Sequence, residues 1–244
     1  IDRAADADAI IATLAQHTGG MIAHCHAQRV QEKPPLLYDL TELQKDANKK
    51  FKLSADDTLK TMQSLYEKHK VLTYPRTDSR ALPEDYLATV TASMQALGDA
   101  YKPFANQILS NKWVKPNKRI FNNAKISDHF AIIPTGIEPK HLTEAEAKVY
   151  DLVTKRFLSV FFPAAEFLIT TRITRIENEP FKSEGKIMVN AGWLQIYGKE
   201  AETDDTPALV PVGAQEKPRA TDIHVDALQT KPPARYTEAT LLSA

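Results

Sequence analysis

The ten residues at positions 71–80 read VLTYPRTDSR, and the rest of the chain is organised around them. A helical pattern ends at Lys70, and Pro75 fixes its own φ and moves Tyr74 out of the helical region. A phenol is a possible covalent nucleophile, and the guanidinium of Arg76 matches phosphate oxygens with its planar fork. The stretch is therefore a candidate phosphoester site. An ordinary loop leading into a helix fits the same residues, and the local chemistry alone favours that second interpretation.

The bulk composition predicts a soluble globular protein. The chain has 244 residues, enough for one large domain or two smaller ones, and 43% of them are hydrophobic and 25% charged. It contains no run of about 18 apolar residues, so we expect no membrane span. The single cysteine, Cys25, excludes an internal disulfide and fits a reducing compartment, so we expect a cytoplasmic protein. His24 and His26 flank it, but neighbours on a strand point to opposite faces, so we expect no metal site there.

A basic segment without acidic residues spans positions 100–127, although the net charge of the chain is zero. Trp113 and Phe121 are interleaved among its cations, which are Lys102, Lys112, Lys115, Lys118, Arg119 and Lys125. Such a segment can contact phosphates and stack bases. It can equally be a solvated loop whose aromatic residues anchor it to the core, and the sequence leaves both interpretations open.

The hydrophobic period changes along the chain from that of helices to that of strands. Apolar residues recur at helical spacing in residues 1–17, 41–51, 54–70, 83–98, 104–109 and 143–161. A period of two predicts strands in residues 21–29, 167–174, 181–190 and 219–228, with residues 194–197 as a continuation of the third. The acidic stretch 200–211 is expected to be an exposed and mobile loop.

The order of these elements predicts an α+β protein with a nested organisation. The helical residues 36–142 lie between a helix–strand piece, residues 1–35, and a β-rich piece, residues 143–231. Because the strand at 21–29 needs partners for its backbone, we expect the two flanking pieces to join in one β-rich domain. Residues 232–244 begin a further domain, and we expect the chain to be a fragment of a longer protein.

Two motifs in a fixed order resemble a known family. Residues 73–79 (TYPRTDS), followed by residues 128–135 (DHFAIIPT), resemble the active-site tyrosine segment and the His-x-Ala-Ile-x-Pro segment of type IA DNA topoisomerases, with the topoisomerase III branch closest. Residues 34–44 and 231–239 resemble the entry to the tyrosine-bearing domain and the exit from the region. The resemblance implies a helical tyrosine domain inserted in a β-rich arch, or gate, domain. Two short helices before the tyrosine segment suggest a winged-helix-like arrangement for the insert.

The resemblance also implies roles for individual residues. Tyr74 would attack a phosphodiester of single-stranded DNA, giving a 5′-phosphotyrosine and a free 3′-hydroxyl, and resealing would need no ATP. Arg76 would neutralise the scissile phosphate, and His129 would support the phosphate or proton network. Motif positions suited to DNA contacts and to holding the loop are Thr77, Asp78, Ser79 and Thr135, and Lys125 of the basic segment is a further expected DNA contact.

Other parts of such an enzyme are expected outside this chain. In the family a separate Toprim domain supplies a glutamate, a lysine and an acidic cluster that binds Mg²⁺, and no Asp-x-Asp-x-Asp run occurs here. Asp204 and Asp205 are expected to be solvated surface residues. We therefore expect the chain alone not to relax DNA.

Two alternatives belong to other functional classes. In the first, the chain is a non-catalytic module that binds single-stranded nucleic acid and stacks Tyr74 on a base. In the second, it is a scaffold in which Tyr74 is buried. The enzyme interpretation predicts that Tyr74 is exposed and lies near Arg76 and His129.

Overall fold

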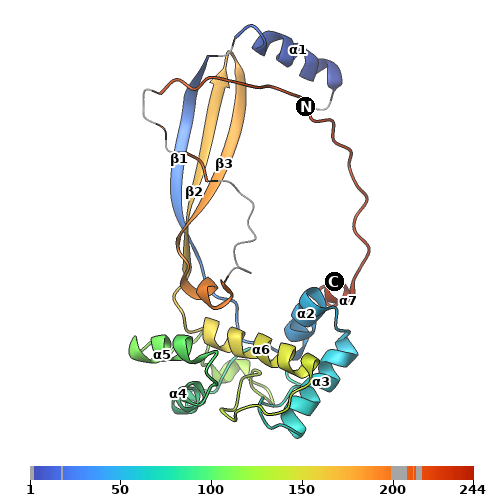
Figure 1. The fold of residues 1–244 in the computed structure, drawn as a ribbon, viewed down its shortest axis with the longest axis vertical. Helices are drawn as coiled ribbons and strands as arrows, with labels where there is room; N and C mark the ends of the chain where they lie inside the picture. Colours follow the sequence, from blue (N-terminus) through green and yellow to red (C-terminus); the bar gives the residue numbers. More distant parts are fainter. Residues whose placement is uncertain (1–2, 18, 199–207, 211, 213–215) are drawn as a thin grey trace. The chain divides into compact units, whose positions relative to one another are not determined.

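The computed structural model describes residues 3–17, 19–198, 208–210, 212 and 216–244. They fall into two compact units (Figure 1). Unit 1 comprises Ile1–Glu32, Ala165–Ala191 and Glu202–Pro233, and unit 2 comprises Lys33–Ala164, Gly192–Ala201 and Ala234–Ala244. Helices and strands are both present, so the predicted α+β class is confirmed. None of the helices in the described part of the chain has both the length and the apolar character that a membrane crossing requires.

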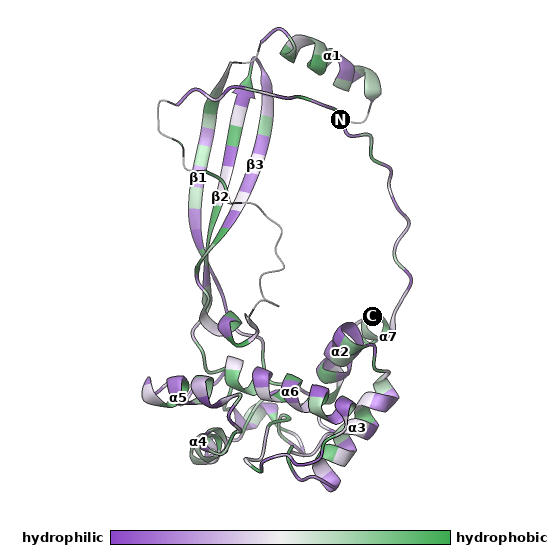
Figure 2. Ribbon diagram, in the orientation of Figure 1, coloured by the Kyte–Doolittle hydropathy of each residue, from purple (hydrophilic) through white to green (hydrophobic). Residues whose placement is uncertain are grey.

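Unit 1 is built on one three-stranded antiparallel sheet in the order β1-β2-β3 (Figure 1). Its elements are α1 (Ala4–Leu14), β1 (Gly20–Glu32), β2 (Ala165–Ile176) and β3 (Glu179–Asn190). The register of β1 and β2 runs from Gly20 opposite Ile176 to Glu32 opposite Ala165, with an irregularity between Ile22 and His24. Hydrophobic and hydrophilic residues are interspersed along these strands (Figure 2). The pairing confirms that the strand before the helical insert finds its partner in the strand after it.

One predicted strand and the predicted continuation of another are absent from the structure. Residues 219–228, all of them described, form no strand and contribute only an isolated bridge between Gly19 and Arg219. Val225 and Leu228, which would lie on opposite faces of such a strand, are 52% and 89% exposed, so neither face is covered by a core there. Residues 194–197 do not extend β3, because a 3₁₀ helix, η2 (Gly192–Ile196), follows it and Gly192 turns the chain at φ +49°. Most of the expected loop at 200–211, with Asp204 and Asp205, lies outside the described residues.

Unit 2 is helical and contains α2 (Leu40–Phe51), α3 (Ala55–Glu67), α4 (Leu87–Gln95), α5 (Lys102–Ser110), η1 (Asn123–Lys125), α6 (Glu144–Ser159), η2 and α7 (Glu238–Leu241). Side chains cap three helices: Asp39, Ser54 and Thr143 accept hydrogen bonds from the first turns of α2, α3 and α6. Ser54 and Thr143 stand where the sequence predicts caps, whereas α2 is capped by Asp39 and not by the Thr41–Gln44 pair that its sequence favours. The caps stabilise each helix at its amino end, which lets the loops between them be irregular.

The helical unit extends further along the chain than the boundary predicted at residue 142. Helix α6 packs against α2 and α3, and its Val149 and Val153 lie fully buried in one cluster with Leu65 of α3. The unit therefore continues to Ala164. The helical period of α6 identified a buried face, but only the tertiary contacts show which core that face enters.

The aromatic residues of the basic segment anchor it to the core of unit 2. Phe121 is 2% exposed, and the half-buried Trp113 packs on Phe162 with ring centroids 5.0 Å apart. Phe121 is therefore unable to stack on a base. The lysines remain on the surface, and two of them are engaged, with Lys102 bonded to Asp99 and Lys118 to Glu84. The sequence left two interpretations of this segment open. For its aromatic residues, the structure supports the one in which they anchor a loop to the core.

A buried carboxylate joins α3 to the start of α6. Glu146 forms a capping box with Thr143, and its Oε1 accepts a hydrogen bond of 2.6 Å from the Ser64 hydroxyl. The Nε2 of His69 lies 3.3 Å from the same oxygen, which is within ion-pair distance. The two atoms are not aligned for a hydrogen bond. Burial by itself would raise the pKa of Glu146, but the hydrogen bonds from Ser64 and Thr143, helped by His69, outweigh it and lower the pKa to about 2.

We expect unit 2 to lose stability as the pH falls from about 4.5 towards about 2. A carboxyl whose pKa is lower in the folded state binds fewer protons there, so its stabilisation is present above this window and disappears within it. Solvent screening at the helix end limits the effect to roughly 1–2 kcal/mol. Urea unfolding followed by tryptophan fluorescence measures it, because Trp113 and Trp193 both lie in unit 2.

In this experiment Glu146→Gln should remove most of the pH dependence of unfolding that comes from Glu146. Glu144→Gln is the matched control, since Glu144 lies in the same first turn with an 83% exposed side chain. Parallel loss of stability in the wild type and in Glu146→Gln between pH 4.5 and pH 2 would contradict the assignment.

Candidate active site

The tyrosine segment leaves the end of α3 through a sharp backbone turn. Lys70 has a left-handed φ of +59°, and the Val71 amide donates to the Leu65 carbonyl at 3.0 Å. The chain then runs beside the segment 129–135, with an isolated bridge between Leu72 and Pro134. Beside Tyr74 the strand-like pairing is limited to this bridge. The segment is nevertheless held on both sides, because α3 and the second motif each bond to it.

Thr73 locks the two motifs together. Its amide donates to the Ile133 carbonyl at 3.0 Å, its Oγ1 accepts from the Ile133 amide at 2.9 Å, and its hydroxyl donates to the Ala131 carbonyl at 3.2 Å. Thr135 adds two bonds at the other end, with its amide donating to Val71 at 3.0 Å and its hydroxyl to Lys70 at 2.7 Å. These bonds set the spacing between Tyr74 and His129, which lie far apart in the sequence.

Tyr74 is half-buried between two aromatic rings. The ring of His129 lies 4.3 Å from it between centroids, tilted by 42°, and the ring of Tyr66 meets it edge-on at 5.4 Å and 82°. The expectation that Tyr74 is exposed is therefore wrong, because two rings from other elements cover part of it. It is not fully buried either, as the scaffold alternative requires.

A pocket of about 410 Å³ opens beside His129. Arg76 and His129 line it together and are both exposed. The other lining residues are Leu40, Thr41, Thr77, Asp78, Ser127 and Asp128. The structure thus brings Tyr74, His129 and Arg76 into one neighbourhood, through a ring contact for the first pair and a shared pocket for the second. A guanidinium and an imidazole at the wall of a polar pocket are suited to holding an anionic oxygen.

Two of the expected DNA contacts point inward. Thr77 and Ser79 are 8% and 3% exposed, and their hydroxyls donate to the carbonyls of His129 at 2.9 Å and Lys125 at 2.8 Å. These bonds hold the loop, which is the second role that the motif positions suggested. Asp78 is exposed and accepts a hydrogen bond of 3.2 Å from Ser127.

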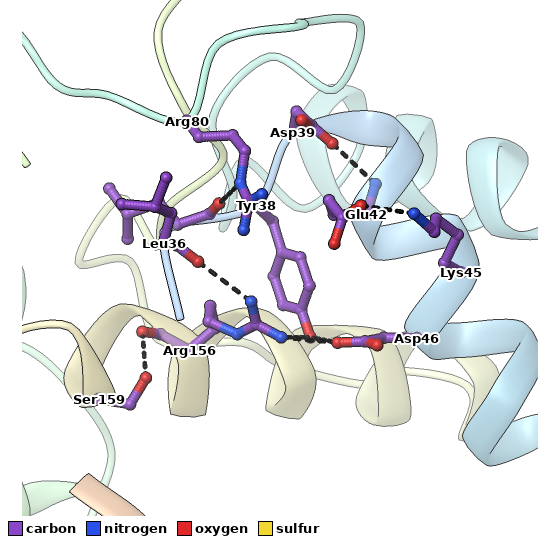
Figure 3. Close-up of polar contacts among 10 residues, drawn as sticks. Leu36, Tyr38, Asp39, Glu42, Lys45, Asp46, Arg80, Arg156 and Ser159 are labelled. Atoms are coloured by element: carbon purple, nitrogen blue, oxygen red, sulfur yellow. Dashed lines mark hydrogen bonds and ion pairs between the residues drawn. The ribbon is translucent and has the colours of Figure 1, made fainter. Parts of the chain in front are cut away.

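A buried polar cluster supports the pocket where the chain enters unit 2 (Figure 3). The Arg156 guanidinium donates to Asp46 at 2.6 Å, to the Tyr38 hydroxyl at 3.0 Å and to the Leu36 carbonyl at 3.0 Å. Tyr38 in turn donates to Asp46 at 2.5 Å, and burial raises the pKa of its phenol well above the usual tyrosine value, so it remains a donor. The cluster fixes the residues before α2, whose first residue, Leu40, bonds to the Thr77 carbonyl.

We expect Arg156→Ala to lower the free energy of unfolding of unit 2 by about 2–3 kcal/mol. Only 11% of the Arg156 side chain is exposed, and its removal leaves Asp46 and the Leu36 carbonyl without their charged partner. Urea unfolding followed by tryptophan fluorescence measures the loss. Lys155→Ala is the matched control on the same helix, because its ion pair with Asp151 is more exposed. Equal stability of the two variants would contradict this role for the cluster.

Sequence reasoning missed three features of this site. Thr73 stands in the motif without a predicted role, and Tyr66 is only one position of the helical pattern in residues 54–70. The Tyr38–Asp46–Arg156 cluster has no signal in the sequence. The one signal in the sequence that could have pointed to Thr73 is its position directly before Tyr74. The other contacts join residues that no spacing rule connects.

No group of three or more His, Cys, Asp or Glu side chains suited to a metal ion exists among the residues that the structure describes. The side chains present at the pocket therefore do not fit a Mg²⁺ site. The resemblance places those ligands in another domain.

Comparison with known proteins identifies the family. A family model described as DNA topoisomerase matches residues 1–244, so the chain belongs to the DNA topoisomerase family, in its type IA class. Within that class its curated relatives bear the name DNA topoisomerase 3. The protein of Bacillus cereus strain ATCC 14579 is 48% identical over 219 residues, which cover 86% of this chain and 30% of the relative.

Two further relatives agree. DNA topoisomerase 3 of Bacillus anthracis is 44% identical over 246 residues, covering 97% of this chain and 34% of the relative, and that of Bacillus subtilis strain 168 is 43% identical over 220 residues, covering 86% and 30%. The chain thus spans about a third of the length of these relatives. Full-length topoisomerase I of Thermotoga maritima shares the fold, with a TM-score of 0.71 at 20% identity over 96% of this chain and 38% of that one.

Proposed function

We propose that this chain is the central part of a topoisomerase III-like enzyme that cleaves and reseals single-stranded DNA through Tyr74. The observation that carries the proposal is the contact of the Tyr74 ring with the ring of His129, which lines a polar pocket together with Arg76. Unit 2 is then the tyrosine domain, and the sheet of unit 1 belongs to the arch, or gate, domain.

The proposed reaction is a transesterification. The phenol oxygen of Tyr74 attacks the phosphorus of a phosphodiester, the phosphorus–O3′ bond breaks, the phenol loses its proton and the departing 3′-oxygen gains one. The products are a 5′-phosphotyrosine and a free 3′-hydroxyl. Because one ester replaces another, the reverse reaction reseals the strand without ATP.

Arg76 and His129 have different parts in this step. The guanidinium of Arg76 neutralises the charge that builds on the phosphate oxygens in the transition state. His129, in contact with the Tyr74 ring, supports the phosphate or the proton network. Lys125, Asp78 and Thr135 are proposed to contact or orient the flanking DNA, whereas Thr77 and Ser79 position the loop through their bonds to main-chain carbonyls.

The remaining parts of the enzyme are proposed to lie in a Toprim domain of the same parent protein, which acts in the cytoplasm. The resemblance implies that this domain would also hold Mg²⁺, which would supply positive charge for the DNA phosphates. The present residues bind and orient the strand and supply the nucleophile. The chain alone is therefore expected to bind single strands weakly and not to relax supercoils.

A suicide oligonucleotide tests the proposal. A single-stranded oligonucleotide labelled at its 3′ end is incubated with the full-length enzyme and Mg²⁺, and the mixture is denatured. Because the protein becomes joined to the 5′-phosphate of the downstream piece, the label should remain on the protein, at Tyr74 by peptide mapping. Binding in native gels without retention of label after denaturation would instead support the non-catalytic binding module.

A further inference from the structure

Three aromatic rings meet at the candidate active site, and the proposed chemistry uses only two of them. The third is Tyr66, which meets Tyr74 edge-on with a centroid distance of 5.4 Å and an interplanar angle of 82°. His129 covers the ring at 4.3 Å. Edge-to-face contacts of this length are favourable and directional, so they restrict the rotation of the ring they touch.

The backbone alone leaves the phenol of Tyr74 undirected. Thr73 and Pro75 hold the main chain on both sides of Tyr74, but rotation about the Cα–Cβ bond still moves the phenol oxygen relative to that backbone. Ring contacts are what can select one rotamer. An in-line attack requires such selection, because the nucleophilic oxygen must lie opposite the departing O3′.

Tyr66 stands on a rigid part of the molecule. Its neighbours Met62 and Leu65 on α3 are fully buried, and Leu65 accepts the hydrogen bond from Val71 that begins the tyrosine segment. Ser64 is bonded to the buried Glu146 of α6. The end of α3 is therefore tied to the core and to the segment that carries Tyr74.

A cation covers part of the Tyr66 ring. The Nζ of Lys70 lies 5.6 Å from its centroid, within the range of a cation–π contact. The carbonyl of Lys70 accepts the hydrogen bond from the Thr135 hydroxyl at 2.7 Å. The turn after α3 thus joins Tyr66 to the end of the His129 motif, so that Tyr66, Tyr74 and His129 form one connected unit.

We propose that Tyr66 is a positioning residue for the cleavage reaction: its ring, held at the end of α3, fixes the orientation of the Tyr74 phenol against His129. The inference rests on the proposed function. Tyr66 contributes through the shape of its ring and takes no part in proton or phosphoryl transfer. The reaction rate should therefore depend on an aromatic side chain at this position and not on the hydroxyl.

The test measures three quantities in the full-length enzyme carrying Tyr66→Leu. They are the single-turnover rate of adduct formation at a saturating concentration of the suicide oligonucleotide, the dissociation constant for that oligonucleotide, and the melting temperature. A small displacement of a reacting atom costs about 10–100-fold in rate. We expect a loss in that range with the dissociation constant unchanged, and Tyr66→Phe should restore the rate.

Tyr101→Leu is the matched control. Tyr101 is another half-buried tyrosine of unit 2, and its hydroxyl bonds to Asp151 at 2.9 Å, away from the Tyr74 contacts. It reports the effect of losing a tyrosine from the packing of this unit, and it should leave the single-turnover rate unchanged. If Tyr66→Leu does not fold, Tyr66→Met removes the ring with an unbranched helix former and takes its place.

The outcomes distinguish the positioning role of Tyr66 from the proposed function on which it rests. If Tyr66→Leu formed the adduct at the wild-type rate, or if Tyr66→Phe lost as much rate as Tyr66→Leu, the positioning role would be overturned. The proposed function would still stand in that case, provided that Tyr74→Phe formed no adduct. Adduct formation by Tyr74→Phe at the wild-type rate would overturn both. A rate loss in Tyr66→Leu that Tyr101→Leu reproduces would assign Tyr66 to packing alone and would overturn the inference.

Discussion

Tyr74→Phe should eliminate the covalent DNA adduct of the full-length enzyme, lowering the cleavage rate by about 10⁴-fold or more, as removal of a nucleophile does in other covalent enzymes. The substitution removes one oxygen and keeps the ring. The contacts to His129 at 4.3 Å and to Tyr66 at 5.4 Å depend on the ring, so the packing of the site should survive. The melting temperature and the affinity for single-stranded DNA should stay close to those of the wild type.

The measurement is retention of a 3′ label on denatured protein, with relaxation of supercoiled DNA as a second readout. Tyr236→Phe is the control, because it makes the same chemical change at a tyrosine that is 72% exposed and outside the pocket. An adduct formed by Tyr74→Phe at an undiminished rate would reassign the nucleophile, and peptide mapping would then identify the residue that holds the DNA.

Arg76→Ala should lower the single-turnover cleavage rate by about 10²–10³-fold, the usual result of removing one preorganised group that stabilises transition-state charge. Arg76 is exposed at the pocket wall, and among the described residues no carboxylate forms an ion pair with its guanidinium. Its charge is therefore available for a phosphate. Arg76→Lys should recover part of the rate, because it keeps the charge and loses the planar fork.

The dissociation constant for single-stranded DNA separates this role from simple attraction. Arg76→Ala should weaken binding much less than it slows cleavage. The control Lys115→Ala removes an exposed cation of the basic segment, and it should reduce binding and its salt dependence without changing the rate at saturation. If Arg76→Ala behaved as Lys115→Ala does, the transition-state role of Arg76 would be excluded.

Much of the fold could be predicted because the signals are local. The apolar pattern of residues 143–161 identified α6, and the period-two pattern identified β2 and β3. The need of β1 for a backbone partner predicted its pairing across the helical insert, which the register with β2 confirms. In each case the physical cause lies within a few residues, or in one general requirement of the backbone.

The errors occurred where a local pattern depends on a distant partner. Residues 219–228 alternate as a strand does, but no strand of the described chain pairs with them to complete a ladder. Residues 194–197 are apolar enough for a strand, yet the turn at Gly192 and the core of unit 2 make them helical. Tyr74 lies in a polar motif, and its partial burial comes from rings on two other segments.

The sequence by itself predicted most of the helices and strands, the pairing of β1 with β2 across a helical insert, and the family, because periodicity and motifs are written in adjacent residues. Through the resemblance it also predicted that Tyr74, Arg76 and His129 belong to one site. Only the tertiary structure decided how that site is held. The Thr73 bonds to Ile133, the Tyr66 ring at the end of α3 and the Arg156 cluster beside the pocket each join residues that are not neighbours in the chain. Such contacts depend on the direction of side chains after packing, and that direction is not a property of any one stretch of sequence.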